Sequence, residues 1–321
     1  MRIVYMGSPR FAVPPLEALV DAGHTVSLVV TQPDRQAGRG RRLTTPPIAI
    51  RAAELGIPIY QPARIRAPDA LERLRSEAPE LIAVAAYGQI LPGAALQIPK
   101  YGCLNVHASL LPRHRGPSPI SAALLAGDAV TGVSIMLMDE GMDTGPVLNR
   151  AETPIQATDD QVTLGERLAR LGARLLADSI DAWASSAVVA QPQDESQATR
   201  CGLVTRSDGI LDWTEPATLL WRQVRAFAEW PQGFTQWDGR LLRIPNAAYD
   251  EGLSAEPGVV IPFGPRSRSP LAAAIGTGRG VLLPRVLALE GRRPAPVDAF
   301  LRGYPSLVGA RLTSAGLRAQ E

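Results

Sequence analysis

The sequence predicts an α/β fold in two parts: an open, mostly parallel β-sheet with helices on both faces, followed by a smaller β-barrel. Three observations support this prediction. The 321 residues exceed the usual size of one domain and suit two. Apolar runs alternate with helical stretches in the first part of the chain, whereas short β-rich runs with frequent Gly and Pro fill the second part.

The first part opens with a βαβ unit. β-Branched runs at residues 2–6 and 25–31 predict two strands, and the apolar spacing of residues 15–22 predicts the helix between them. The same patterns predict further strands at residues 81–86, 103–106 and 132–138, and further helices at 69–76, 120–126 and 163–183. This alternation is typical of a parallel sheet that is covered by helices on both faces.

The second part begins after a polar stretch at residues 191–199, which is typical of a linker. We therefore expect a first domain at residues 1–189, a linker at 190–205 and a second domain at 206–321. The elements expected in the second domain are a helix at 217–227 and strands at 241–244, 258–261, 271–275 and 281–289. Their close spacing is typical of a small barrel, whose core and interface we expect to contain Trp213, Trp221, Trp230 and Trp237.

Composition excludes several classes of protein. Apolar residues make up 45% and charged residues 20%, so neither disorder nor a fibrous structure is indicated. No run approaches the ~18 apolar residues of a membrane helix. The apolar run at residues 3–6 is too short for a signal peptide, so we expect a cytoplasmic protein. Cys103 and Cys201 lie in no CxxC motif, which argues against a disulfide framework or a zinc site.

In an open parallel sheet the ligand lies beyond the C-terminal ends of the strands, so the residues after each strand are the candidates for a site. Gly7-Ser8-Pro9 follows the first strand and lacks the GxGxxG spacing of a dinucleotide site. A nicotinamide cofactor is therefore not expected.

Histidine is scarce, which narrows the search for a general acid or base to three positions. His24 precedes a strand, where a structural role is expected, and His114 lies among arginines in a loop. His107 ends the apolar run that contains Asn105, and residues two apart on a strand face the same way. An amide and an imidazole at the end of a strand indicate either catalysis or a hydrogen-bonded core histidine.

An acidic, glycine-rich turn, DEGMDTG at residues 139–145, follows a later strand. Its glycines allow positive φ and can aim a carboxylate inward, although a solvated acidic turn has the same composition. Spacing alone does not rank Asp139, Glu140 and Asp143. Ser109 lacks the GxSxG context of a nucleophile, so Asn, His and Asp side chains here suit direct acyl transfer better than a covalent route.

Several motifs in order along the chain resemble the formyltransferase family. Asn105-Val106-His107-Ala108-Ser109-Leu110-Leu111-Pro112 resembles its signature, together with Arg115-Gly116 and Asp143-Thr144-Gly145. The resemblance covers nearly the whole chain and is closest to the members that act on methionyl-tRNA, through residues 6–12, 31–35, 38–42, 86–92 and 210–213. It implies a Rossmann-like catalytic domain, a C-terminal OB-like barrel that binds tRNA, 10-formyltetrahydrofolate as the formyl donor, and no metal.

The resemblance also implies roles for individual residues. The catalytic trio would be Asn105, His107 and Asp143. The residues that line the folate site would be Ser109, Leu110, Leu111 and Pro112, with Tyr87, Gly88, Gln89, Ile90 and Leu91 around the pterin.

A basic loop, DRQAGRGRR at residues 34–42, carries Arg35, Arg39, Arg41 and Arg42. Four arginines among small residues can enclose a phosphate backbone, although a solvated basic loop has the same composition. With the resemblance, the loop implies initiator methionyl-tRNA as the acceptor, in an enzyme that we expect to be a monomer. The alternatives are formyl transfer to a nucleotide-linked amino sugar, hydrolysis of formyltetrahydrofolate, and RNA binding without catalysis.

Overall fold

The computed structural model describes residues 1–37, 42–264 and 272–314, and describes Ala37 and Arg42 by their backbone alone. The chain forms two compact units. The first unit comprises Met1–Pro119, Ala129–Ile155 and Leu164–Gly202, and the second comprises Ile120–Asp128, Gln156–Thr163 and Leu203–Glu321. Residues 190–202, most of the expected linker, therefore belong to the first unit.

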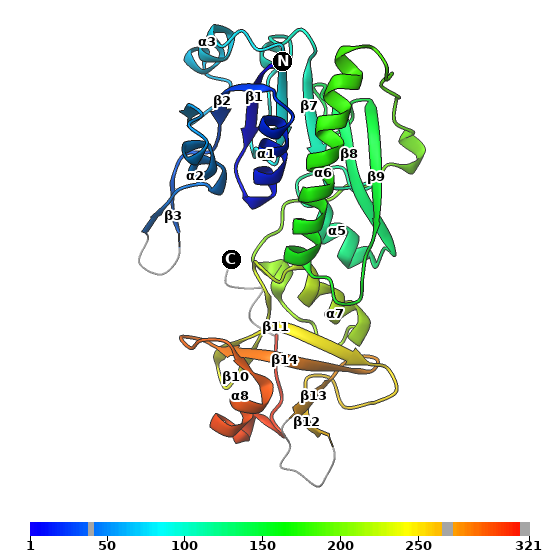
Figure 1. Cartoon of the computed structure of the whole chain (residues 1–321). Coiled ribbons are helices and arrows are strands. Elements are labelled where there is room, and N and C mark those ends of the chain that lie inside the picture. The colour runs from blue at the N-terminus through cyan, green and yellow to red at the C-terminus, as the bar shows by residue number, and fades with distance from the viewer. Residues whose placement is uncertain (38–41, 265–271, 315–321) are drawn as a thin grey trace. The chain divides into compact units, whose positions relative to one another are not determined.

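A seven-stranded sheet forms the centre of the first unit, in the order β5-β2-β1-β6-β7-β8-β9. Its strands are β1 (Arg2–Gly7), β2 (Thr25–Val30), β5 (Ile59–Tyr60), β6 (Leu81–Ala85), β7 (Cys103–His107), β8 (Val130–Leu137) and β9 (Val147–Pro154) (Figure 1). The strands from β5 to β7 in that order pair in parallel, whereas β8 is antiparallel to both of its neighbours. The predicted mostly parallel sheet is thus confirmed.

The sequence patterns did not predict the two edge strands of this sheet. β5 has only two residues, too few for any periodicity, and β9 is half polar and largely exposed beyond Leu148. A two-stranded hairpin, β3 (Arg35–Ala37) and β4 (Arg42–Thr44), was also not predicted, although it frames the basic loop.

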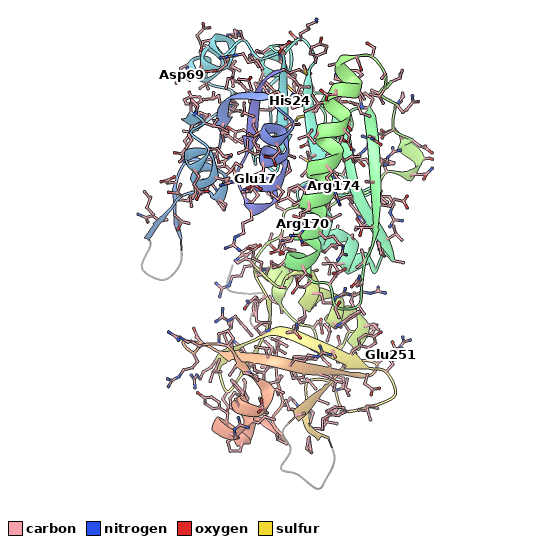
Figure 2. The ribbon with its side chains drawn as sticks, viewed as in Figure 1. Glu17, His24, Asp69, Arg170, Arg174 and Glu251 are labelled. Atoms are coloured by element: carbon pink, nitrogen blue, oxygen red, sulfur yellow. The ribbon has the colours of Figure 1, made fainter. Side chains whose placement is uncertain are left out.

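Helices of the first unit include α1 (Val13–Asp21), α2 (Pro47–Glu54), α3 (Pro68–Ser76), α4 (Gly93–Leu96) and α6 (Gln161–Ala184). α6 is amphipathic, with Leu168 and Leu175 buried and with Arg170 and Arg174 on its exposed side (Figure 2). A Cβ added at Gly172 of α6 would lie 2.6 Å from a side-chain carbon of Val106. The glycine therefore lets α6 approach β7 closely.

The second unit is built on an antiparallel sheet in the order β10-β11-β14-β13-β12, with β15 paired to β14. Its strands are β10 (Gly233–Trp237), β11 (Arg240–Asp250), β12 (Val260–Phe263), β13 (Ala272–Gly276), β14 (Val281–Leu289) and β15 (Ala295–Pro296), and its helices include α5 (Pro119–Ala126), α7 (Ala217–Ala226) and α8 (Val297–Gly303). Residues 309–313 bond both edges, β12 through Val260 and β10 through Gln236. This last segment closes the sheet into the expected barrel.

Three of the four tryptophans lie where the sequence predicted. Trp213 and Trp237 are buried in the core of the second unit, and Trp221 packs against that core from α7. The prediction was wrong for Trp230, which is 55% exposed. Trp230 follows the end of α7 in a turn, outside the alternating positions of the strands.

Candidate active site

The end of β7 places Asn105 and His107 on one face of the first sheet. The register with β8 sets Asn105 opposite Met136 and His107 opposite Ser134. Val106 points to the other face, toward Gly172 of α6. The alternation along the strand thus separates an apolar face, which α6 covers, from a polar face that carries the amide and the imidazole.

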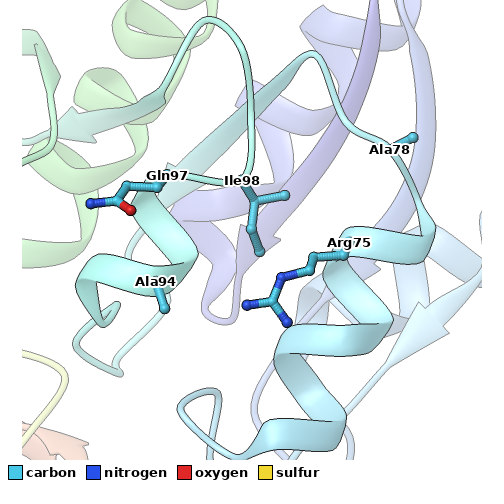
Figure 3. Close-up of a pocket in the computed structure, with 5 residues that line it drawn as sticks. All are labelled: Arg75, Ala78, Ala94, Gln97 and Ile98. Carbon is cyan, nitrogen blue, oxygen red and sulfur yellow. The ribbon is translucent and has the colours of Figure 1, made fainter.

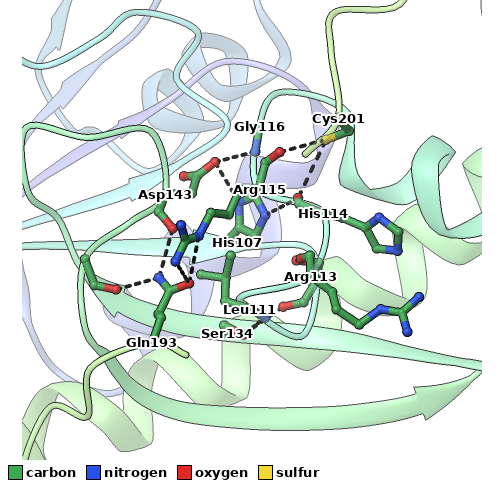
Figure 4. A network of polar contacts seen from close by, with 12 residues as sticks. His107, Leu111, Arg113, His114, Arg115, Gly116, Ser134, Asp143, Gln193 and Cys201 are labelled. Carbon is green, nitrogen blue, oxygen red and sulfur yellow. Dashed lines mark hydrogen bonds and ion pairs between the residues drawn. The ribbon is translucent and has the colours of Figure 1, made fainter. Parts of the chain in front are cut away.

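Both ring nitrogens of His107 face oxygen atoms. Nε2 lies 3.0 Å from the carbonyl oxygen of His114, and Nδ1 lies 3.6 Å from Oδ2 of Asp143 (Figure 4). A carbonyl oxygen only accepts, so Nε2 carries a hydrogen, and a second hydrogen on Nδ1 suits the facing carboxylate. The ring is 5% exposed, and a ring with hydrogens on both nitrogens has no N–H directed elsewhere in this conformation.

Asp143 is held both by its backbone and by its carboxylate. Its φ of 56° lies in the left-handed region, which few residues other than glycine adopt. Its Oδ2 accepts the backbone N–H of Gly116 at 2.8 Å. This bond fixes the carboxylate between the loop after β7 and the ring of His107.

The other two carboxylates of the acidic turn have different surroundings. Oδ1 of Asp139 accepts from Gly141 N–H at 3.0 Å and from the hydroxyl of Thr144 at 2.7 Å, so it stabilises the turn itself. Glu140 is exposed and lies against the start of α4. Tertiary structure thus ranks the three acids that spacing left unranked, and Asp143 is the one that faces His107.

The side chain of Asn105 has different surroundings from that of His107. Its side chain is half-buried, and it makes no hydrogen bond with any other residue that the structure describes. An amide offers two donors and a carbonyl acceptor. Asn105 is therefore the member of the expected trio whose donors are available to a ligand.

The residues predicted to line the folate site continue the chain from β7. Ser109 is buried, and its hydroxyl donates to the carbonyl of Arg113 at 2.5 Å. The N–H of Leu111 donates to Ser134 Oγ at 3.0 Å, and that hydroxyl donates to the carbonyl of Ser109 at 2.8 Å. Ser134 therefore anchors the segment Ser109–Pro112 to β8.

The segment predicted to surround the pterin follows β6. Tyr87 and Leu91 are buried in the apolar core of the first unit, and burial raises the pKa of the Tyr87 hydroxyl. The amide of Gln89 accepts the N–H of Ile65 at 2.8 Å and so belongs to the framework. Gly88 and Ile90 are exposed, the latter by 77%.

The structure describes two of the four arginines of the basic loop, one of them by its backbone alone. Arg35 is exposed on β3, and its guanidinium donates to Gln32 Oε1 at 2.8 Å. Arg42 stands on β4, where its backbone pairs with Ala37. Arg39 and Arg41 lie outside the described residues.

Sequence patterns missed the residues that tie these loops together. Arg115 is 2% exposed, and its guanidinium donates to Gln193 Oε1 and to both oxygens of Glu195. Gln193 and Glu195 stand in the polar stretch that was expected to be a linker. Their composition resembles that of any solvated loop, so only a three-dimensional contact distinguishes them.

A shallow hollow of about 460 Å³ lies elsewhere in the first unit. It is lined by Arg75, Ala78, Ala94, Gln97 and Ile98, from α3 and from the turn at α4 (Figure 3). A second hollow of about 260 Å³ lies in the second unit, beside Trp213. Neither hollow is lined by any residue of the expected trio, so the polar contacts, rather than a cavity, mark the candidate site.

Two features are absent from the described part of the chain. Within the described ranges no group of three or more His, Cys, Asp or Glu side chains is placed to hold a metal ion. No helix in the described part of the chain is long and apolar enough to cross a membrane.

Two family models match the chain, one to each part. The model described as formyl transferase matches residues 1–180, and the one described as formyl transferase, C-terminal domain, matches residues 203–305. The methionyl-tRNA formyltransferase of Chloroflexus aggregans is 45% identical over 304 residues, 94% of this chain and 97% of that protein. Its counterpart from Citrifermentans bemidjiense is 41% identical over 321 residues, 99% of each chain.

Solved structures share the fold. HypX from Aquifex aeolicus, in complex with tetrahydrofolic acid, matches 96% of this chain and 48% of its own with a TM-score of 0.66. Its sequence is 17% identical, so the likeness concerns the fold alone.

Proposed function

This chain belongs to the formyl transferase family, and we propose that it transfers the formyl group of 10-formyltetrahydrofolate to the amino group of initiator methionyl-tRNA. Relatives named methionyl-tRNA formyltransferase, about two fifths identical along nearly the whole chain, support the acceptor. The observation that carries the proposal is the pair of His107 and Asp143 on the strand face that also carries Asn105, whose amide has no hydrogen-bond partner among the described residues. The enzyme would act in the cytoplasm, where tRNA is charged, as a monomer.

In the proposed reaction the methionyl nitrogen attacks the formyl carbon, and the bond from that carbon to the folate nitrogen breaks. The amine loses one proton, and the folate nitrogen gains one. Negative charge develops on the formyl oxygen, where the amide of Asn105 donates a hydrogen bond. The positively charged ring of His107 stabilises that oxygen, and a direct bond from Nε2 requires the ring to release the His114 carbonyl.

Asp143 has two roles in this mechanism. Its carboxylate orients the ring of His107 from 3.6 Å and would balance the positive charge that the ring carries in the proposed reaction. It also relays the proton of the amine toward the leaving folate nitrogen, directly or through water.

The donor site would use main chain and apolar surface more than side-chain polar groups. The hydroxyl of Ser109 and the amide of Gln89 already bond to the protein. Leu110 and Pro112 after β7, with Gly88 and Ile90 after β6, would therefore provide the contacts with the folate. The buried Tyr87, Leu91 and Leu111 would support that surface from below.

The arginines of the basic loop support a polyanionic acceptor. Arg35 is exposed and its guanidinium donates to Gln32, while Arg39, Arg41 and Arg42 follow it in the sequence. Such a loop would hold the phosphates of the tRNA through charge, without reading its bases.

The proposal is tested by mixing the protein with 10-formyltetrahydrofolate and one of three acceptors: charged initiator tRNA, a nucleotide-linked amino sugar, or water alone. We expect formylmethionyl-tRNA, detected by mass spectrometry of the released amino acid. Transfer to the sugar alone would overturn the acceptor assignment, and release of formate alone would indicate a hydrolase. Retention of tRNA without any product would indicate a binding protein.

A further inference from the structure

The chain between the two matched ranges crosses the candidate site. Residues 191–201, here called the strap, follow the range of the first family model and precede that of the second. The backbone of Gln191 pairs with Val147 at 2.8 Å in both directions. Thr199 donates to the Pro112 carbonyl at 3.2 Å and accepts from Arg115 N–H at 2.9 Å. The strap therefore bonds to both loops that carry the partners of His107.

The side chain of Gln193 joins these two loops. Its Oε1 accepts from Nε and from a terminal nitrogen of Arg115, at 3.0 and 2.9 Å. Its Nε2 donates to the carbonyl oxygens of Asp143, at 2.8 Å, and of Gly145, at 2.6 Å (Figure 4). A primary amide is the neutral side chain that can accept twice at one atom and donate twice at another, and all four of these capacities are used here.

Two of the hydrogen bonds of Gln193 hold the backbone of the acidic turn, at Asp143 and Gly145. Asp143 has the left-handed φ of 56°, a conformation that non-glycine residues keep only when their surroundings impose it. Gln193 holds the carbonyl of this residue, and Gly116 holds its carboxylate. The direction in which the carboxylate faces His107 therefore depends on both loops at once.

Gln193 also bonds to a buried cation, the guanidinium of Arg115. The guanidinium of Arg115 donates two hydrogen bonds to the carboxylate of Glu195, at 2.9 and 2.6 Å. This residue of the strap therefore balances the charge of Arg115. Arg115 directly follows His114, whose carbonyl accepts from the ring of His107. Both oxygen atoms that orient the ring thus lie on segments that Gln193 bridges.

We propose that Gln193 is a positioning residue for the reaction: it sets the carboxylate of Asp143 against the ring of His107. The inference rests on the proposed function and adds a residue that stands outside both family ranges. Gln193 touches neither reacting group and acts through Asp143.

The main test replaces Gln193 with Leu, which has a similar volume and no polar atoms. We expect kcat for formylation to fall about 10- to 30-fold while KM for both substrates stays within twofold, since the lost interaction acts on the transition state. Gln193→Glu keeps the acceptor for Arg115 but sets a carboxylate oxygen against two carbonyl oxygens, and it should lower kcat at least as much. Gln191→Leu is the matched control, because the side chain of Gln191 is exposed and, among the described residues, hydrogen-bonds only to the Val189 carbonyl; its kcat should stay within twofold.

A double-mutant cycle separates positioning from a general structural role. In an Asp143→Ala background, Gln193→Leu should lower kcat by less than twofold, because the group that it positions is gone. Multiplication of the two effects, or near-normal kcat in Gln193→Leu alone, would overturn the proposal.

A measurement independent of formylation uses protein labelled with ¹⁵N-histidine. The chain has three histidines, so His107→Ala assigns the signals of the ring. The Nδ1 signal of His107 should move in Gln193→Leu and in Asp143→Ala toward the same position, and should stay in place in Gln191→Leu. An unmoved signal in Gln193→Leu would refute positioning, whereas absence of formylation by the wild-type protein would refute only the proposed function.

Discussion

The two compact units differ in the kind of side chain that they bury. The first unit buries His107 and Arg115 around the loop after β7, with the ring facing a carbonyl oxygen and a carboxylate and with the guanidinium paired with a carboxylate. The main core cluster of the second unit consists of apolar side chains, half of them leucines, and Arg292 and Arg293 of that unit are exposed. Buried polar side chains that are paired, as in the first unit, are suited to catalysis. Exposed positive charge, as at Arg292 and Arg293, is suited to binding a polyanion.

The sharpest way to break this comparison is to remove the paired groups of the first unit. His107→Ala and Asp143→Ala should each lower turnover by about a hundredfold or more, because a donor or its charged support is lost from the transition state. The measurement is single-turnover formylation, with circular dichroism to show that the fold persists. Glu140→Ala, which removes an exposed acid of the same turn, is the control, and near-normal rates in the first two variants would refute the assignment.

A smaller effect should follow from removing positive charge from the basic loop. Arg39, Arg41 and Arg42 replaced together by Ala should lower kcat/KM for charged tRNA by about tenfold and reduce the slope of log affinity against log salt by up to about three. Folate KM should not change. The measurement is formylation across a salt series, and a rise in folate KM would place the loop in the donor site instead.

Alkaline pH should separate the stability of the two units. Complete burial raises the pKa of Tyr5, and burial raises that of Cys103 to about 12, both in the first unit. These groups ionise in the unfolded chain before the folded one. The stability that these two protonated groups contribute is therefore fully present below about pH 9 and is lost as the pH rises toward 12. The loss is about 1.4 kcal/mol per pH unit for each group between its unfolded-state and folded-state pKa.

Urea unfolding at pH 8 and pH 10.5 tests this difference. In a Trp183→Phe background, which removes the tryptophan of the first unit, fluorescence follows Trp213, Trp221, Trp230 and Trp237 of the second unit. Far-UV circular dichroism follows mainly the first unit, which contains α6 and most of the helical residues. The dichroism midpoint should fall more than the fluorescence midpoint. Cys103→Ala should reduce that fall, and equal shifts of both midpoints in both proteins would contradict the prediction.

The smallest effect should come from the exposed arginines of the second unit. Arg292→Ala with Arg293→Ala should lower kcat/KM for tRNA only about threefold and reduce the salt slope by at most about two, because these residues would contribute charge without orienting the acceptor. Formylation at two salt concentrations measures this. An effect larger than that of the hairpin arginines would reverse the ranking of the two cationic surfaces.

Periodicity predicted most of the first sheet because its central strands are continuous apolar runs between helical patterns. β14 was predicted with its exact bounds for the same reason. β5 and β9 were missed because edge strands are short or polar and carry little periodic signal. Gln193 was missed because the same residue type occurs in a solvated loop and at a position where its side chain hydrogen-bonds two loops together.

The sequence by itself determined the α/β class, the two-part organisation, and the common face of Asn105 and His107, since alternation along a strand is a local property. Only the tertiary structure decided that Asp143, rather than Asp139, faces the ring, and that the strap holds it there. These choices depend on contacts between segments far apart in the chain, which no local pattern encodes.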